Sequence, residues 1–507
     1  MRDANRNSAQ PSRQHRRWRR LAFHLAAMVV VLLPLLLAEL ALRLCVASPP
    51  LRADDPYVSF SNLTPLFVPD ATGMRFETAT DRLIAFRPQS FAATKPPETF
   101  RVFCLGGSTV QGRPYSVETS FTTWLQLDLE AARPETNWEI INCGGISYAS
   151  YRLVPIMAEL LDHEPDLFVV YTGHNEFLED RTYGHVKRTP RVLVRLHRTL
   201  LGLRSYALAD RWLADRRAKR TDAARPLKTV LAPEVRAKLD LRKGLEAYHR
   251  DPMWRQGTID HFHRNLETLV RMARNVEVPV ILVNPVANLK DCPPFKSQFR
   301  TDLTEAEREH VLNLWERAQQ LGWSNVHEKI GLLEQAAAID NQHAGLLYLI
   351  GMCYEHVGRA TEAKQWFVRA KEQDICPLRI LEPMHEAILE VAAQYHVPLA
   401  DARATIEQQT EDGIPGSDWL LDHVHPSIAG HQLIAEALYQ VMAEMNLAPP
   451  PGDWRARREN RRQQHLATLN DAYYAQGKAR LRRLQEWSRG RIPKSSAHPA
   501  DASNDRP

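Results

Sequence analysis

The chain has 507 residues, enough for more than one domain, with 44% hydrophobic and 25% charged residues. Its formal net charge is +5, but residues 1–20 hold seven Arg and one Asp, and residues 451–507 hold thirteen Arg or Lys and six acids, which leaves −8 for residues 21–450. Because the basic charge lies mainly at the termini, the composition argues against a nucleic-acid-binding protein.

The first predicted element is a membrane anchor. Residues 21–44 are mostly Leu, Val and Ala, long enough with their flanks to span a bilayer and too long for an ordinary signal-peptide core. The Arg-rich segment 1–20 before it predicts a cytoplasmic N-terminus and a periplasmic body beyond residue 45. We therefore expect a single-pass protein of the inner membrane. Cleavage after Ala47 is the alternative, and lipidation at Cys45 is disfavoured because the preceding Leu42-Arg43-Leu44 lacks small residues.

Residues 45–99 are rich in proline and aromatic residues, with scattered strand patterns such as Leu83 to Phe86. We interpret them as a membrane-proximal stalk that packs on the next domain. The six cysteines of the chain follow no metal-ligand spacing and are too sparse for a disulfide scaffold. We therefore expect buried free thiols, for example at Cys104 and Cys143, and predict no metal and no cofactor.

A serine follows a glycine turn in the segment 100–112. Val102 to Leu105 is a short apolar run, typical of a strand buried on both faces, and Gly106-Gly107 lets the backbone turn sharply before Ser108. A helix is predicted from Thr119 to Ala132. Ser108 should therefore lie at the carboxyl end of a strand, where parallel sheets carry their sites, and could act as a nucleophile if a base reaches it. A phosphate-binding turn or an ordinary loop is the alternative.

Two further apolar runs end in similar motifs. Asn142-Cys143-Gly144-Gly145 closes the strand predicted from Trp138 to Ile141, and Gly173-His174-Asn175-Glu176 closes the strand predicted from Asp166 to Thr172. One parallel sheet would bring these motifs and Ser108 to the same edge.

Residues 188–244 interrupt this pattern. From Lys187 to Lys228 there are thirteen basic residues and three acids, interleaved with apolar residues at helical spacing. The segment is either a helix lying on anionic lipid or, as we favour, a helical packing insertion with a solvated basic face.

The sheet resumes with a helix predicted from Ile259 to Ala273 and a strand from Val278 to Val283. The following loop leaves the carboxyl end of a strand and should line the cleft. Asn288 and Lys296 in this loop are therefore candidates for substrate binding, although an exposed surface lysine is the commoner case.

Residues 303–376 are predicted to be helical and inserted into the domain that contains the parallel sheet. The segment Ala344 to Asp374 resembles a tetratricopeptide repeat in its placement of small and aromatic residues, and part of it recurs at a shift of 34 residues, as Leu333, Ala336 and Asp340 match Phe367, Ala370 and Asp374. One repeat is therefore predicted and a second favoured, with a protein partner as the implied ligand.

Residues 377–447 return to the sheet. They should supply a helix from Met384 to Tyr395, a strand from Val397 to Ala400 and a closing helix from Ser427 to Met445. Just before that last helix stands Asp422-His423-Val424-His425, and a spacing of three puts Asp422 and His425 on one side of a turn. Residues 448–507 are predicted to be a basic helix followed by a disordered tail.

In order and chemistry, the four motifs resemble the blocks of the SGNH hydrolases, the GDSL esterase and lipase superfamily, over roughly residues 100–187, 257–300 and 378–446. The resemblance implies a three-layer α/β/α, flavodoxin-like fold with a parallel sheet (residues 100–302 and 377–447). It also implies that Ser108 is the nucleophile, His425 the base and Asp422 its orienting partner. The implied oxyanion donors are the N–H groups of Ser108 and Gly144 and the amide of Asn175.

Some alternatives remain at this stage. Gly145 rivals Gly144 as a donor, and His423 rivals His425. Gly107 and Glu176 depart from the family, which has Asp at both positions. The function implied is a membrane-anchored serine esterase acting on an acyl ester, on a carbohydrate or cell-envelope polymer. An O-acyltransferase that modifies exported polysaccharide and a non-catalytic binding protein are the other classes.

Overall fold

The computed structural model describes residues 65–179, 237–240 and 244–488, with the isolated positions 39, 41 and 206. The predicted anchor (21–44, apart from positions 39 and 41), most of the basic insertion (188–244) and the end of the tail (489–507) lie outside the described residues. Within the described ranges, no helix combines the length and the hydropathy needed to cross a bilayer. The chain divides into two compact units, Met1–Leu63 with Lys187–Ala223, and Thr64–Val186 with Ala224–Pro507. The second unit contains Ser108, Asp422 and His425.

A five-stranded parallel sheet organises this unit. Its strand order is β5 (Asn137–Gly144), β4 (Thr99–Gly106), β6 (Leu167–Tyr171), β7 (Val280–Asn284) and β8 (Leu399–Asp401). The registers pair Gly106 with both Gly144 and Tyr171, so neighbouring strands end level with one another. The predicted α/β fold with a parallel sheet is confirmed, and the carboxyl ends of β4, β5 and β6 meet at one edge.

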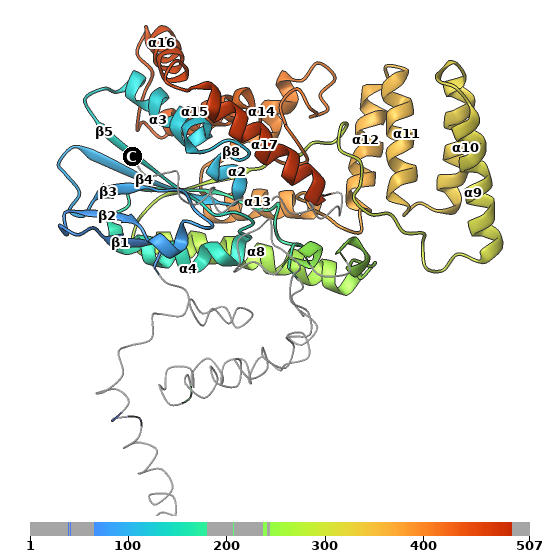
Figure 1. The fold of residues 1–507 in the computed structure, drawn as a ribbon, viewed down its shortest axis with the longest axis horizontal. Coiled ribbons are helices and arrows are strands. Elements are labelled where there is room, and N and C mark those ends of the chain that lie inside the picture. The colour runs from blue at the N-terminus through green and yellow to red at the C-terminus, as the bar shows by residue number, and fades with distance from the viewer. Residues whose placement is uncertain are drawn as a thin grey trace, which may run out of the picture. The chain divides into compact units, whose positions relative to one another are not determined.

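Alternate residues of each strand pack on opposite layers of helices. Val102 and Cys104 of β4 and Val169 of β6 join one core with α3 (Phe121–Ala132) and α15 (Ile428–Glu444). The opposite layer is formed by α4 (Ser150–Leu160), α8 (Pro252–Arg274) and α13 (Glu382–Tyr395). Figure 1 shows α3 and α15 on one side of the sheet and α4 and α8 on the other. Cys104 and Cys143 are buried free thiols, as predicted.

The described part of the predicted stalk forms its own small sheet. The strands β1 (Phe67–Pro69), β2 (Arg75–Thr78) and β3 (Ser90–Ala92) pair antiparallel in this order. Aromatic contacts hold this sheet to β4: the rings of Phe91 and Phe103 are 5.5 Å apart, and the buried Arg101 guanidinium donates to the carbonyl of Ala92. The strand expected from Leu83 to Phe86 is wrong, because this segment is a turn after the 3₁₀ helix η1 (Thr80–Arg82).

Four helices are inserted between β7 and β8, as predicted: α9 (Glu305–Gln320), α10 (Val326–Ile339), α11 (Ala344–His356) and α12 (Ala360–Glu372). They have a core of their own, separate from that of the sheet. A Cβ added to Gly351 of α11 would lie 2.7 Å from the Phe367 ring of α12. This close approach is the small-against-aromatic packing that the sequence pattern predicts; the assignment to a tetratricopeptide repeat stays a prediction.

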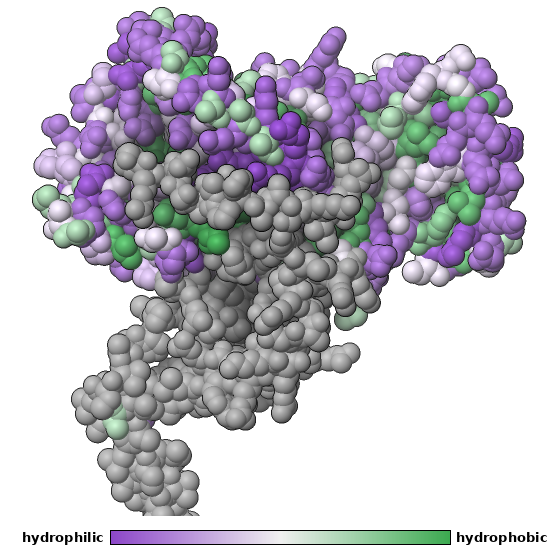
Figure 2. Space-filling model, in the orientation of Figure 1, coloured by the Kyte–Doolittle hydropathy of each residue, from purple (hydrophilic) through white to green (hydrophobic). Residues whose placement is uncertain are grey.

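The basic tail packs on the helices around the parallel sheet through two helices of its own, α16 (Trp454–Leu466) and α17 (Asp471–Ser488). In α16, Arg462 makes a buried ion pair with Asp128 of α3, and Trp454 stacks on Tyr439 of α15 with ring centroids 4.3 Å apart. In α17, Tyr473 hydrogen-bonds Thr119 at 2.7 Å. The described surface in Figure 2 is mostly hydrophilic, with apolar side chains appearing in small patches.

Candidate active site

The site begins where β4 meets a short helix. β4 ends at Gly106, and Ser108 opens α2 (Ser108–Gln111). A Cβ on Gly106 would lie 2.2 Å from the Tyr171 carbonyl oxygen and 2.3 Å from Val110, so only glycine fits between the two strands and the helix at this point. The tight turn holds Ser108 at the carboxyl edge of the sheet with 8% of its surface exposed.

Ser108, His425 and Asp422 form a continuous hydrogen-bonded chain. The Ser108 Oγ lies 2.8 Å from His425 Nε2, and His425 Nδ1 lies 2.7 Å from Asp422 Oδ2. The other carboxylate oxygen, Oδ1, accepts the backbone N–H groups of Val424 and His425, each at 2.9 Å. This arrangement orients the imidazole with one nitrogen toward the serine and the other toward the carboxylate.

The surroundings keep the Asp422 carboxylate charged. Burial alone would raise its pKa, but the neighbouring imidazoles of His425 and His423 and the hydrogen bond from His425 outweigh burial, and the net pKa is lowered. His423 itself is buried, and that burial lowers its pKa to about 4. Its Nδ1 is 3.6 Å from Asp422 Oδ1, its ring faces Phe295, and among the described contacts none joins it to Ser108. His425 is therefore the histidine that reaches the serine.

Asn288 and Lys296, the residues predicted to bind substrate, both donate hydrogen bonds to backbone carbonyls. Asn288 is buried, donates its N–H to the His423 carbonyl at 3.0 Å, and donates its side-chain amide to the Asp422 carbonyl at 3.1 Å. The Lys296 ammonium donates to the carbonyls of Leu245 and Tyr248 at 2.8 and 2.7 Å. Both side chains are engaged in holding loops. The sequence placed them in the right loop but could not show which way they point.

Arg379 is a supporting residue that the sequence did not single out. Its buried guanidinium donates to the carbonyls of Asn288 and Cys292, both at 2.8 Å. It thereby fixes the loop that in turn braces the Asp422–His423 backbone. Its guanidinium also lies 3.8 Å from the buried Asp374 carboxylate, and no sequence motif would have identified these partners.

Asn175 lies beside the turn that precedes Ser108. Its Nδ2 donates to the Tyr148 carbonyl at 3.0 Å, and a Cβ added to Gly107 would lie 2.5 Å from this same nitrogen. The amide therefore occupies the space where any larger side chain at position 107 would stand. This packing gives a physical reason for glycine at a position where the SGNH pattern has Asp.

The turn after β5 changes the expectation for the second backbone donor. The Gly144 N–H donates to Asn142 Oδ1 at 3.0 Å, and the Gly145 N–H donates to the Gly106 carbonyl at 3.0 Å. Gly144 also packs directly under α2, since a Cβ there would lie 2.2 Å from the Gln111 nitrogen. Both predicted candidates are thus already hydrogen-bonded inside the protein.

Ser147 also lies in this turn and was not among the predicted donors. The neighbouring N–H groups of Ile146 and Tyr148 donate to the carbonyls of Ala85 and Gly145, whereas the Ser147 N–H donates to none of the described residues. Ser147 also has a φ of +63°, uncommon for a residue other than glycine, and is buried.

Glu176, the other departure from the family pattern, supports the site from behind. Its carboxylate accepts the N–H of Ser150 at 2.7 Å and the Ser150 hydroxyl at 2.8 Å, at the first turn of α4. A carboxylate at a helix N-terminus is favourable. Glu176 therefore ties the loop that carries Asn175 to the layer of helices beneath the sheet.

Comparisons with known proteins add only structural likeness. No family model matches the chain, and no characterised protein matches it in sequence. Similar solved structures include a putative lipolytic protein of the G-D-S-L family from Desulfitobacterium hafniense DCB-2, with 11% identity over 67% of this chain and 98% of that chain and a TM-score of 0.29. The acetylxylan esterase Axe2 from Geobacillus stearothermophilus has 13% identity over 68% and 94% of the two chains, with a TM-score of 0.31. LAE5, an alpha/beta hydrolase from the metagenome of Lake Arreo, has 12% identity over 68% and 95%, with a TM-score of 0.30.

Proposed function

We propose that the protein is a serine esterase of the SGNH type, and that Ser108, His425 and Asp422 carry the reaction. The observation that supports this most directly is the Ser108–His425–Asp422 chain of hydrogen bonds, at 2.8 and 2.7 Å. A buried serine, an imidazole and a buried carboxylate in this order are the parts that activate a hydroxyl for attack on a carbonyl.

In the proposed first half-reaction, Ser108 Oγ attacks the carbonyl carbon of the ester while its proton passes to His425 Nε2. Asp422 stays ionised and stabilises the imidazolium that forms, without accepting the proton. Collapse of the tetrahedral intermediate breaks the bond to the leaving alcohol, which takes the proton from His425. An acyl group remains on Ser108.

The developing oxyanion would be held by preorganised donors at the edge of the sheet, each worth on the order of a hundredfold to a thousandfold in rate. We propose the Ser108 N–H at the start of α2 and the Asn175 amide, which lies against Gly107. For the third donor we propose the N–H of Ser147 in place of Gly144, because the Gly144 N–H is bonded to Asn142.

The second half-reaction decides between a hydrolase and a transferase. Water attacking the acyl-enzyme, with His425 as base, gives hydrolysis, and a sugar hydroxyl in the same place gives O-acyl transfer.

We propose hydrolysis of an acyl ester on a carbohydrate or cell-envelope polymer, on the periplasmic side of the inner membrane. Fusing alkaline phosphatase after residue 100 tests on which side of the membrane the chain beyond this residue lies. We expect the fusion to be active, as it would be in the periplasm.

Turnover of p-nitrophenyl acetate tests the reaction. Ser108→Ala and His425→Ala should each remove most activity, and the double variant should cost little more, because residues that act as a unit give non-additive losses. Adding a sugar acceptor separates transfer from hydrolysis by the appearance of acylated sugar. If the folded His425→Ala variant turns over p-nitrophenyl acetate as fast as the unaltered chain, the proposed triad is contradicted.

A further inference from the structure

The basic helix α17 lies against the loop that follows the proposed nucleophile. The Arg480 guanidinium of α17 donates to the carbonyl of Tyr115, in the loop after α2, at 3.1 Å. Farther along the helix, the side-chain amide of Gln485 donates at 3.4 Å to the carbonyl of Leu421, which directly precedes the aspartate of the proposed triad. The helix therefore extends from the loop after Ser108 to the turn that carries the base.

Arg113, in the same loop, has a guanidinium group that no described residue engages. Its backbone N–H donates to the Ser108 carbonyl at 3.1 Å, which holds Arg113 beside the nucleophile. The side chain is partly buried. Of its three nitrogens only Nε is both fully buried and without a partner, so the two terminal nitrogens are accessible. Together they carry four N–H donors, which a ligand can reach.

Three further arginines lie near Arg113 and form with it what we call the arginine cluster. They are Arg87, in the turn after η1, and Arg480 and Arg483 of α17. Burial and the positive charges of these three side chains lower the pKa of Arg113 to about 9, and among the described residues no carboxylate is one of the charged groups that act on it. Arg113 therefore still carries its charge at neutral pH.

The segment that carries Arg87 also borders the proposed active site. The carbonyl of Ala85 accepts the side-chain amide of Gln111 at 2.8 Å and the N–H of Ile146 at 2.9 Å. Gln111 ends α2, and Ile146 directly precedes Ser147, the proposed third oxyanion donor. Two loops and α17 thus bring the arginine cluster together next to the nucleophile.

The charge and burial of the cluster favour a small anionic group as its ligand. Residues 21–450 have a net charge of −8, so this concentration of arginine is a local feature. Like charges repel at close range, and guanidinium groups bind the oxygens of carboxylates and phosphates bidentately. Of the four arginines only Arg483 is exposed, whereas a surface that lies on anionic lipid presents its cations to the solvent.

We propose that the arginine cluster binds a carboxylate or phosphate group of the substrate, so that the polymer whose ester is cleaved at Ser108 is anionic. The terminal nitrogens of Arg113 donate to the anion, and the other three guanidinium groups add positive charge around it. The assignment of this anion to a substrate rests on the proposed esterase, but the binding of the anion does not require the reaction.

A pair of small acetyl esters that differ by one negative charge tests the preference. The substrates are 4-acetoxybenzoate and methyl 4-acetoxybenzoate, each with kcat/KM divided by its rate of uncatalysed hydrolysis. We expect the unaltered chain to prefer the anionic ester. Arg113→Gln should lower the ratio of the two values by about tenfold, within the range of one hydrogen bond to a charged group. Arg113→Lys keeps the charge and should lower the ratio less.

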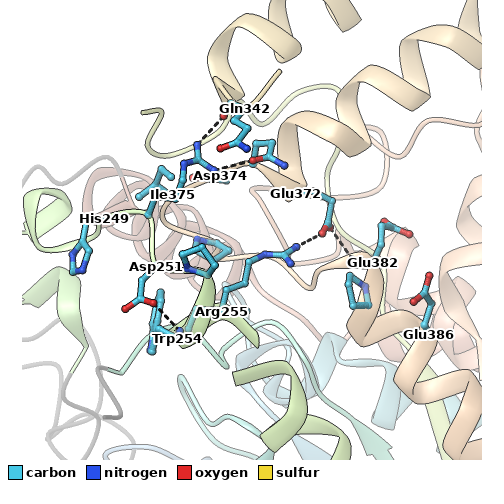
Figure 3. Close-up of a pocket in the computed structure, with 16 residues that line it drawn as sticks. His249, Asp251, Trp254, Arg255, Gln342, Glu372, Asp374, Ile375, Glu382 and Glu386 are labelled. Carbon is cyan, nitrogen blue, oxygen red and sulfur yellow. Dashed lines mark hydrogen bonds and ion pairs between the residues drawn. The ribbon is translucent and has the colours of Figure 1, made fainter. Parts of the chain in front are cut away.

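Arg255 of α8 provides the matched control. Figure 3 shows its guanidinium extending to the Glu372 carboxylate, with which it forms an ion pair. Because this arginine already has an anionic partner, Arg255→Gln should leave the ratio of the two esters unchanged.

Isothermal titration of the full-length chain carrying Ser108→Ala measures anion binding without turnover. A hexamer of galacturonate or of glycerol phosphate should bind more tightly than the neutral galactohexaose, and the tighter of the two identifies the anion as a carboxylate or a phosphate. Adding Arg113→Gln should weaken the binding of that hexamer by about tenfold.

Three results would overturn the arginine site. They are galactohexaose binding as tightly as both anionic hexamers, unchanged hexamer binding in folded Arg113→Gln, or an effect of Arg113→Gln on binding to phosphatidylglycerol vesicles but not to either hexamer. Binding of an anionic hexamer by a chain that turns over neither ester would instead reject the esterase and retain the anion site.

Discussion

Replacing Asp422 by Asn should leave the fold intact and remove the base from the reaction. Asp422 Oδ1 accepts the N–H groups of Val424 and His425, and the oxygen of an Asn amide can keep these two bonds. Its Nδ2 then faces His425 Nδ1, where the carboxylate oxygen now stands at 2.7 Å. Two donors cannot face each other, so the imidazole must carry its proton on Nε2 and point it at Ser108. The lone pair that would accept the serine proton is lost.

The expected cost is about 10⁴-fold in kcat, near 5 kcal/mol of transition-state stabilisation, with little change in KM. Turnover of p-nitrophenyl acetate measures it, and a Tm within a few degrees of the unaltered chain shows that the variant is folded. The matched control is His423→Asn, since His423 is a buried neighbour of the same carboxylate without a described contact to Ser108; it should cost less than about tenfold. A folded Asp422→Asn variant that keeps more than about a tenth of kcat, or a larger loss in His423→Asn, would refute this reasoning.

Further predictions concern the oxyanion donors, pH and the inserted helices. Asn175→Ala should lower kcat by about a hundredfold or more with little effect on KM, and Gly107→Ala should lower kcat by displacing the same amide; unchanged steady-state kinetics in either would exclude this donor. Burial lowers the pKa of His431 to about 3, so the folded state binds fewer protons than the unfolded chain once the pH falls below about 6.5. As the pH falls below about 6.5, this residue should lower the free energy of unfolding, measured in urea, by about 1.4 kcal/mol per pH unit. His431→Gln should reduce the slope of the free energy of unfolding against pH by that amount. An unchanged slope would contradict the lowered pKa of His431. Glu309→Lys and Glu316→Lys, on the exposed face of α9, should leave turnover of a small ester unchanged, and a large fall in kcat in a folded variant would show that the inserted helices shape the site.

The strands of the parallel sheet were predictable because each is an apolar run that ends in glycine or a small polar motif. The short helix α2 was not predicted, since four residues from Ser108 carry no helical periodicity of their own. The carboxyl ends of β4, β5 and β6 were expected at one edge because a parallel sheet places the motifs that follow its strands on the same side, and the structure has this arrangement. The three-stranded sheet of residues 67–92 was missed because its strands are only three or four residues long.

Within the site, the motifs and their resemblance to the SGNH blocks predicted Ser108, His425 and Asp422, and the structure brings these three side chains within hydrogen-bond distance. The direction of individual groups could not be predicted. Gly144 fits the SGNH pattern, yet its N–H donates to the side chain of Asn142. This local hydrogen bond sets the direction of the N–H and could not be predicted from the motif. The carbonyls that accept from Lys296 belong to Leu245 and Tyr248, 51 and 48 positions earlier in the chain. Such long-range backbone partners leave no trace in a sequence motif.

Labelling with a fluorophosphonate probe tests the central claim most directly, because the probe reacts only with a serine that a neighbouring base has activated. We predict that the intact chain is labelled and that peptide mass spectrometry finds the adduct on Ser108. Labelling should be absent in Ser108→Ala and nearly absent in His425→Ala. An adduct that persists in Ser108→Ala, or no adduct on the folded, unaltered chain, would contradict the proposal that Ser108 is the nucleophile.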